Sequence, residues 1–210
     1  MVAGVAHEIR NPLGGIELFV GLLSDGTDSL PESQRHVEKI AKEVRYLKDI
    51  VDRFLEYARP ADPQREPCRI DPVLHEVEAL LEPEFRRSGA EISVAPSASS
   101  LTARIDPNHF KRIVLNLARN AIAAMPQGGR FTVSAEADER RILIRFADTG
   151  TGIAPDAKPK IFSPFFTTRE KGTGLGLSIV KGLAESNGGH ITLLRSDTGG
   201  TVFELDLEKV

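Results

Sequence analysis

The sequence of 210 residues is poor in features that would place it in several common classes of protein. It holds one cysteine, Cys68, so no disulfide can form within the chain, and this usage fits a reducing compartment. Its formal net charge of −3 excludes the strong basic field typical of nucleic-acid-binding proteins. No apolar run approaches the roughly 18 residues of a membrane span, and no signal-peptide pattern opens the chain. We therefore expect a soluble, cytoplasmic chain that contacts neither nucleic acid nor membrane.

Two amphipathic helices are predicted at the start of the chain, separated by the turn-like segment SDGTDSLP. Positions in alternating steps of three and four form a stripe, as in a helix of a bundle. The stripe consists of Val2, Val5, Ile9, Pro12, Ile16, Phe19 and Leu23 in the first helix, and of Val37, Ile40, Val44, Leu47, Val51, Phe54 and Ala58 in the second. Two such helices alone bury too little apolar surface. We expect two hairpins to pair as a four-helix homodimer.

The segment HEIRNP places His7, Glu8 and Asn11 on the face of the first helix that lies opposite the apolar stripe. A solvated polar face is the ordinary explanation for such residues. A neutral imidazole is also a competent nucleophile near pH 7, and a neighbouring carboxylate can accept its proton as the ring attacks. Pro12 removes a backbone donor and favours a kink near His7. The residues by themselves leave both interpretations open.

A charged segment with three prolines, ARPADPQREP at 58–67, indicates a linker after the helical hairpin. The second helix should therefore end near Ala58. We expect a hairpin domain at 1–58, a linker at 59–67 and a second domain at 68–210.

The second domain alternates between helical and strand patterns. A helix is predicted over about 72–87 with Asp71 as its cap, and another after Asp106 with Pro107 in its first turn. The strands are EISVA, TARI, the hairpin FTVSAEA with RILIRFA, and the final pair HITLLRS and TVFELDLE. One more helix over about 175–185 ends at a glycine pair. Strands with helices segregated on one side form an α+β protein, here a two-layer α/β sandwich.

Asn116 and Asn120 lie one turn apart on one face of the helix LNLARNAIAAM. An amide oxygen can ligate magnesium, which keeps most of its waters and needs few protein ligands. A structural hydrogen bond is the alternative role for either side chain.

Asp148 leads into a glycine-rich turn at the end of a strand, in FADTGTGIAP. A carboxylate at the base of a pocket is a natural acceptor for the amino group of adenine. The sequence DTG is also common in ordinary turns, so by itself it does not distinguish an adenine-binding carboxylate from a structural turn residue.

Three glycines, Gly172, Gly174 and Gly176, open directly onto a helix in SPFFTTREKGTGLGLSIV. Close approach of the backbone together with a helix N-terminus presents amide donors to phosphate. Arg169 and Lys171 add positive charge. The spacing matches neither the phosphate loop nor the dinucleotide fingerprint, and a flexible hinge is the alternative.

In their order and spacing, HEIRNPL, NLARNA, DTGTGI, PFFTT and KGTGLGL resemble the catalytic core of a sensor histidine kinase. The resemblance covers essentially the whole chain. It implies a dimerisation and histidine-phosphotransfer hairpin followed by an ATP-binding domain of the Bergerat type. The form HEIRNPL, with PFFTT and a short lid before GTGLGL, is most similar to the nitrogen-regulator-type branch of the family.

The resemblance also implies roles for individual residues. His7 would be the phosphoacceptor and Glu8 its base, while Asn11 would orient water for dephosphorylation of the partner regulator. Asn120 would ligate magnesium, with Asn116 beside it. The ATP-binding residues would be Asn116, Asn120, Asp148, Gly150, Gly152, Thr201 and, in a lid from 165 to 176, Phe165, Thr167, Thr168, Arg169, Lys171, Gly172, Thr173, Gly174, Leu175 and Gly176.

The activity implied is ATP- and magnesium-dependent autophosphorylation of His7, with transfer of the phosphoryl group to an aspartate of a response-regulator receiver domain. Two departures from the family pattern concern the nucleotide. Thr149 stands where asparagine is frequent, and Ala123 and Ala124 stand where many members have a lysine and an aromatic residue. The affinity for ATP is therefore expected to be modest.

Two other classes of function remain open at this stage. An ATPase of the gyrase, mismatch-repair and heat-shock type would lack HEIRN on a hairpin and would carry a glutamate where Asn116 stands. A non-catalytic dimeric scaffold, or an ATP-binding regulator that docks a partner, would be expected to have lost His7, Asn120, Asp148 or the lid glycines. Because only six residues precede His7, we expect a core whose sensor and any membrane segments lie upstream.

Overall fold

The computed structural model describes residues 2–24, 30–58, 62–95, 101–169 and 172–210 of the chain. The chain divides into two compact units. One consists of Met1–Arg59 with Pro164–Leu175, and the other of Pro60–Ser163 with Gly176–Val210. Among the helices within the described ranges, none is both long enough and apolar enough to cross a membrane.

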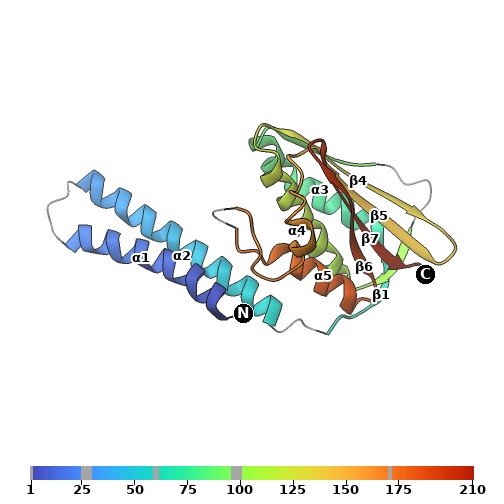
Figure 1. The fold of residues 1–210 in the computed structure, drawn as a ribbon, viewed down its shortest axis with the longest axis horizontal. Coiled ribbons are helices and arrows are strands. Elements are labelled where there is room, and N and C mark those ends of the chain that lie inside the picture. The colour runs from blue at the N-terminus through green and yellow to red at the C-terminus, as the bar shows by residue number, and fades with distance from the viewer. Residues whose placement is uncertain (1, 25–29, 59–61, 96–100, 170–171) are drawn as a thin grey trace. The chain divides into compact units, whose positions relative to one another are not determined.

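The N-terminal hairpin consists of α1 (Val2–Ser24) and α2 (Leu30–Ala58), which pack along one another (Figure 1). Both predicted helices, including the end of the second at Ala58, are confirmed. α1 continues through Pro12, so this proline does not end the helix. Between the helices the Phe19 ring stacks on His36, and Lys39 Nζ lies 4.9 Å from the centre of the Phe19 ring. Several apolar side chains stay exposed, namely Leu13, Leu18, Val20, Leu22, Val37, Val44 and Val51.

The second unit is built on a five-stranded sheet with the strand order β2-β4-β5-β7-β6. β2 and β4 run parallel, and the other neighbours are antiparallel. The strands are β2 (Ala90–Val94), β4 (Gly129–Ala137), β5 (Arg141–Asp148), β6 (His190–Asp197) and β7 (Gly200–Glu208). A separate two-stranded sheet pairs β1 (Glu66–Arg69) with β3 (Thr102–Ile105).

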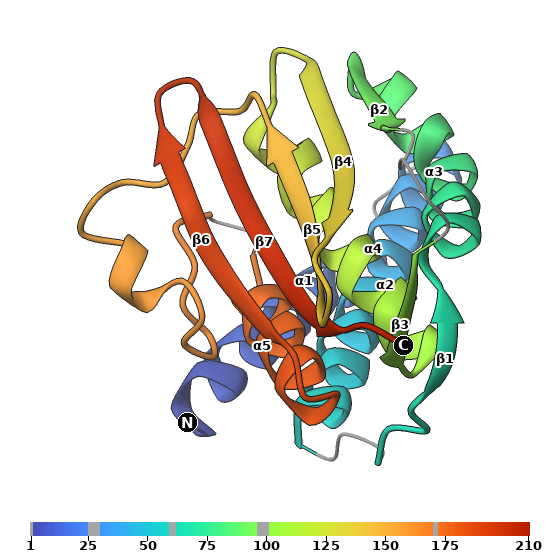
Figure 2. The same ribbon diagram turned by 90° about the vertical axis from the view of Figure 1, so that its right-hand side faces the viewer.

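Helices cover one face of the five-stranded sheet (Figure 2). They are α3 (Ile70–Arg87), α4 (Pro107–Ala124) and α5 (Gly176–Ser186), with the short 3-10 turn η1 (Lys158–Lys160) in the connection before α5. The core lies between these layers, where alternate strand residues point inward and Phe131 stacks on both Phe85 and Phe146. The predicted two-layer α/β sandwich is confirmed.

The opposite face of the sheet is polar. Arg145 bonds Glu204 of β7 and Glu136 of β4, and Arg141 bonds Asp206 at 2.6 Å. These cross-strand pairs follow from the same alternation, because every second residue of β4, β5 and β7 points away from the helices.

The predicted cap of α3 and the predicted extent of the linker both need correction. α3 begins at Ile70, so its N-cap is Arg69, and Asp71 lies in the first turn instead of capping the helix. Both differences are due to β1, a strand that the sequence analysis did not predict. It begins at Glu66, inside the expected linker, and leads directly into α3, where the N–H of Ile70 donates to the carbonyl of Leu101. α4, by contrast, begins after Asp106 as predicted, and Asp106 caps it by accepting from the N–H groups of Asn108 and His109.

A buried polar cluster ties the start of this unit to its helices. Asn187, at the end of α5, donates to His109 Nδ1 at 3.0 Å and accepts from the N–H of Asp106 at 2.9 Å. The Asp106 carboxylate accepts from the N–H of Gln64 at 3.0 Å, and Arg65 donates to the Asn187 carbonyl. The chain from Gln64 onward is therefore fixed to the α/β sandwich by hydrogen bonds that reach residues 42 to 122 positions away.

Candidate active site

The three residues expected on the phosphoacceptor helix, His7, Glu8 and Asn11, belong to α1. Their side chains lie outside the described residues. Because an α-helix has 3.6 residues per turn, the Cα atoms of His7 and Asn11 are about one turn apart on the same side of α1.

The two asparagines of α4 face the start of α5. A Cβ placed on Gly176 would lie 3.6 Å from Asn116 Oδ1 and 3.6 Å from Asn120 Nδ2. Both side chains are half-buried, and the Asn116 amide donates to the carbonyl of Arg112 one turn earlier. Two amide side chains and the N-terminus of α5 therefore lie together. We call this group of Asn116, Asn120 and the start of α5 at Gly176 the polar wall.

Asp148 ends β5, and its carboxylate is held by the turn that follows. Its Oδ1 accepts from the N–H of Gly150 at 2.9 Å and from the N–H of Thr201 at 3.2 Å. Strand register explains the second bond, because Asp148 and Thr201 are paired positions of β5 and β7. Asp148 and Thr201, singled out separately in the sequence, thus lie side by side.

Glycine allows close packing around this turn. A Cβ on Gly150 would lie 2.8 Å from the Cβ of Ala124 at the end of α4, and the N–H of Thr151 donates to the Ala124 carbonyl at 3.0 Å. Gly152 has a φ of +73°, and a Cβ there would overlap the carbonyl of Asp197. The turn is therefore pressed between α4, which carries the asparagines, and the end of β6.

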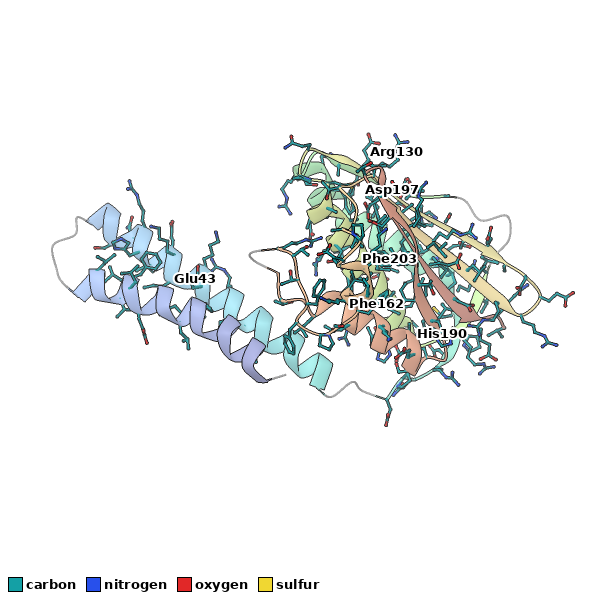
Figure 3. All side chains as sticks on the ribbon, viewed as in Figure 1. Glu43, Arg130, Phe162, His190, Asp197 and Phe203 are labelled. Carbon is teal, nitrogen blue, oxygen red and sulfur yellow. The ribbon has the colours of Figure 1, made fainter. Side chains whose placement is uncertain are left out.

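Thr149, one departure from the family pattern, bonds the start of β4. Its Oγ1 accepts from the N–H of Arg130 at 2.9 Å, and its own N–H donates to the Arg130 carbonyl at 3.1 Å. Figure 3 shows Arg130 and Asp197 at the same end of the sandwich. The second residue of the DTG turn therefore serves to join two strands.

The expected lid forms a loop whose two ends approach each other. Phe165 and Gly174 both have a φ of +63°, and a Cβ on Gly174 would overlap the backbone of Phe165. Near its middle, the N–H of Arg169 donates to Thr167 Oγ1 at 3.1 Å, while Thr168 is exposed. Thr173 and Leu175 are buried, and a Cβ on Gly172 would overlap Thr167. Lys171 lies outside the described residues.

Ser196 is a residue of this region that the sequence analysis missed. Its Oγ lies 3.0 Å from Thr201 Oγ1 and accepts from the N–H of Ile153 at 2.8 Å, while its carbonyl accepts from Lys158 Nζ at 2.6 Å. Simple alternation along β6 could not reveal this inward position, because the pairing of β6 with β7 shifts register between Leu193 and Arg195. Phe162 makes a T-shaped ring contact with Phe203 of β7 (Figure 3).

The donor chemistry fits magnesium bound together with phosphate. Asn120 offers a neutral amide oxygen, one of the hard ligands that magnesium accepts. Over the part of the chain that the structure describes, no group of three or more His, Cys, Asp and Glu side chains could hold a metal alone. Magnesium keeps several waters and is usually bound together with substrate phosphates, so Asn120 would be one ligand among these.

Two protein families match the chain. The model of histidine kinase-, DNA gyrase B-, and HSP90-like ATPases matches residues 105–210, and that of the His Kinase A (phospho-acceptor) domain matches residues 1–63. The chain belongs to the histidine kinase family. The first match contains the asparagines, Asp148 and the lid, while the second contains His7, Glu8 and Asn11.

Individual relatives agree with this assignment. Sensor histidine kinase ZraS of Salmonella typhi is 33% identical over 98% of this kinase core, and sporulation kinase D of Bacillus subtilis (strain 168) is 32% identical over 99%. The chain spans 44% and 41%, respectively, of the lengths of these two relatives.

Solved structures share the fold. Histidine kinase ThkA in complex with the response regulator protein TrrA superimposes with a TM-score of 0.84, at 29% identity, over 100% of this chain and 61% of that one. Full-length ShkA in complex with AMPPNP gives a TM-score of 0.74, at 28% identity, over 99% of this chain and 45% of that one.

Proposed function

We propose that this chain is the autokinase core of a two-component system. It binds ATP with magnesium in the α/β sandwich, phosphorylates His7 and passes the phosphoryl group to an aspartate of a response-regulator receiver domain. The observation that carries the proposal is the wall formed by Asn116, Asn120 and the start of α5 at Gly176, next to the turn of Asp148. The family match to a phospho-acceptor domain in the same chain supports the choice of acceptor.

The wall and the adjoining turn of Asp148 have separate tasks in binding. The Asp148 carboxylate accepts a hydrogen bond from the adenine amino group, and its fixed position in the turn gives that bond its direction. The N-terminus of α5 presents backbone N–H groups and a positive dipole end to the phosphates. Asn120 supplies an oxygen ligand for magnesium, with Asn116 on the same face. Bound magnesium neutralises charge on the phosphates.

The chemical step takes place at His7. A ring nitrogen of the neutral imidazole attacks the γ-phosphorus, a P–N bond forms, and the bond from phosphorus to the bridging oxygen of ADP breaks. Glu8 accepts the proton from the other ring nitrogen as positive charge develops on the ring. The segment HEIRN lies on α1, within the match to the phospho-acceptor domain family, and this supports these roles. The chain contributes mainly positioning and charge stabilisation, as is usual for phosphoryl transfer.

Partners follow from the same proposal. The exposed apolar residues of α1 and α2 suit pairing of two hairpins in a four-helix homodimer. The likeness to a kinase crystallised with its response regulator supports a receiver domain as the acceptor protein. Asn11, one turn from His7, is proposed to orient water for dephosphorylation of that regulator, because an amide can both donate to and accept from water.

The decisive experiment is incubation with γ-labelled ATP and magnesium. Label on the chain that is acid-labile and base-stable is expected, and His7→Ala should abolish it while leaving ATP binding nearly intact, since Asn116, Asn120 and Asp148 belong to the sandwich. His190→Ala, which changes an exposed histidine of β6, should label normally. Label retained on the His7 variant would exclude His7 as the acceptor, and ATP binding without any label would favour a dimeric scaffold.

A further inference from the structure

A buried pair of hydroxyl groups adjoins the turn that carries Asp148. Ser196, near the end of β6, is 7% exposed, and Thr201, near the start of β7, is 3% exposed. Their hydroxyl oxygens are 3.0 Å apart. A buried hydroxyl needs partners for both its proton and its lone pairs, so the contacts of Ser196 require an explanation.

Ser196 connects the two ends of the turn from Asp148 to Ile153. At the far end, the N–H of Ile153 donates to Ser196 Oγ at 2.8 Å. At the near end, Thr201 both shares a hydrogen bond with the Ser196 hydroxyl and donates its N–H to the Asp148 carboxylate. A series of three hydrogen bonds therefore joins the N–H of Ile153 to the Asp148 carboxylate by way of Ser196 and Thr201.

The backbone of Ser196 is itself held in place. Lys158 donates to its carbonyl at 2.6 Å, which attaches η1 to β6. The next residue, Asp197, packs its carbonyl against Gly152, where a side chain would not fit. The hydroxyl of Ser196 is therefore presented to the turn from a fixed position on β6.

From this geometry we infer that Ser196 is a positioning residue, which fixes the turn so that Asp148 meets the base of the nucleotide. The inference rests on the proposed binding of ATP and concerns recognition of the adenine base. Without the hydroxyl, the N–H of Ile153 and the hydroxyl of Thr201 each lose a partner. The turn is then less restricted, and Asp148 no longer holds the direction that its hydrogen bond to the base requires.

The test compares two nucleotides on the 210-residue chain by titration calorimetry in the presence of magnesium. One is ATP, and the other is purine riboside triphosphate, which lacks the amino group that Asp148 would bind. The unchanged chain should prefer ATP. Ser196→Ala should weaken binding of ATP by about tenfold, the effect of one impaired hydrogen bond, and should leave the analogue nearly unaffected.

Thr192→Ala is the matched control, because it removes an exposed hydroxyl from the same strand and should leave both affinities unchanged. Ser196→Cys, which keeps the volume but offers only a weak acceptor, should repeat the result if the alanine variant does not fold. An equal loss for both nucleotides would show that Ser196 serves the fold alone and would overturn the inference, as would an unchanged preference for ATP. Failure of the unchanged chain to bind either nucleotide would instead contradict the proposed function.

Discussion

Gly152 combines two requirements that a larger residue cannot meet. Its φ of +73° lies in the left-handed region, where a Cβ is unfavourable, and a Cβ would also overlap the carbonyl of Asp197. Gly182 in α5 is the opposite case, because a Cβ there would meet nothing within 4 Å. At the scale of the residue, the same amino acid is therefore essential in the Asp148 turn and dispensable on the exposed side of a helix.

Opposite effects on stability are expected at these two positions. Gly152→Ala should lower the free energy of unfolding by about 1–3 kcal/mol or more, because it adds backbone strain and forces β6 away from the turn. Gly182→Ala should raise it by roughly 0.5–1 kcal/mol, because alanine is the better helix former. Urea unfolding of both variants measures the difference. A Gly152→Ala variant as stable as the unchanged chain would contradict the close packing of Gly152 on β6.

At the scale of the element, the start of α4 and the end of α5 meet in a cluster whose protonation is determined by its hydrogen bonds. The amide oxygen of Asn187 accepts from the N–H of Asp106, so its nitrogen faces His109 Nδ1 as a donor. His109 Nδ1 must then be the acceptor, which places the ring proton on Nε2 in the neutral form. His109 and Asn187 are 4% and 1% exposed, so water cannot readily replace these bonds.

The pKa values in the cluster are shifted in a consistent direction. Burial lowers the pKa of His109, with Arg112 acting the same way, and the opposing charge of Asp106 does not outweigh them. For Asp106, burial acts to raise the pKa, but the N–H groups of Gln64, His109 and Asn108 together keep it below its ordinary value. The native state is therefore most stable when the His109 imidazole is neutral and the Asp106 carboxylate is ionised.

Acidification should destabilise the α/β sandwich in two stages. Below an unfolded-state pKa of about 6.5, the unfolded chain binds a proton at His109 that the native chain resists, so stability falls by at most about 1.4 kcal/mol per pH unit until the lowered native pKa is reached. Below about pH 4 the contribution of Asp106 is lost in the same sense. Urea unfolding between pH 7 and pH 4 measures this slope.

His109→Asn is the informative variant, because its amide oxygen can replace the Nδ1 acceptor without titrating. It should reduce the slope between pH 6.5 and pH 5, whereas His190→Asn, a change of an exposed histidine, should not. A slope that His109→Asn leaves unchanged would mean that another group causes the acid sensitivity.

At the scale of the whole molecule, the hairpin is the part whose burial is incomplete within one chain. Val44 is 50% exposed, and other apolar residues of both helices are similarly open to solvent. A second hairpin would cover such a surface, because helices in bundles bury apolar stripes against each other. The sandwich, in contrast, contains its own core, with Phe85, Phe110, Phe131 and Phe146 almost fully buried.

Replacing Val44 and Leu47 of α2 together by glutamate should convert the proposed dimer to a monomer, because pairing would bury unpaired charges. Sedimentation equilibrium measures the mass. Leu80→Glu provides the control, since Leu80 is also an exposed apolar residue but belongs to α3 of the sandwich, and this variant should stay dimeric. A double variant of the hairpin that remains a dimer would place the interface elsewhere.

Much of this architecture was determined by local sequence. The apolar stripe predicted both helices of the hairpin, the Asp106-Pro107 pair predicted the start of α4, and alternation predicted the β4–β5 hairpin. These features depend on residues a few positions apart, so the sequence contains all the information they need. The family motifs similarly predicted functional roles for Asn116, Asn120 and Asp148, since each lies within a short recognisable segment, and these roles stay predictions.

Only the tertiary structure decided which of these residues lie together and what supports them. β1 exists because it pairs with β3, about 36 positions later in the chain, and a strand of four residues has too weak a pattern to reveal this by itself. Ser196 points toward Thr201 because a register shift interrupts the alternation of β6. Hydrogen bonds between distant segments depend on strand pairing and helix packing, and no local pattern encodes the partner.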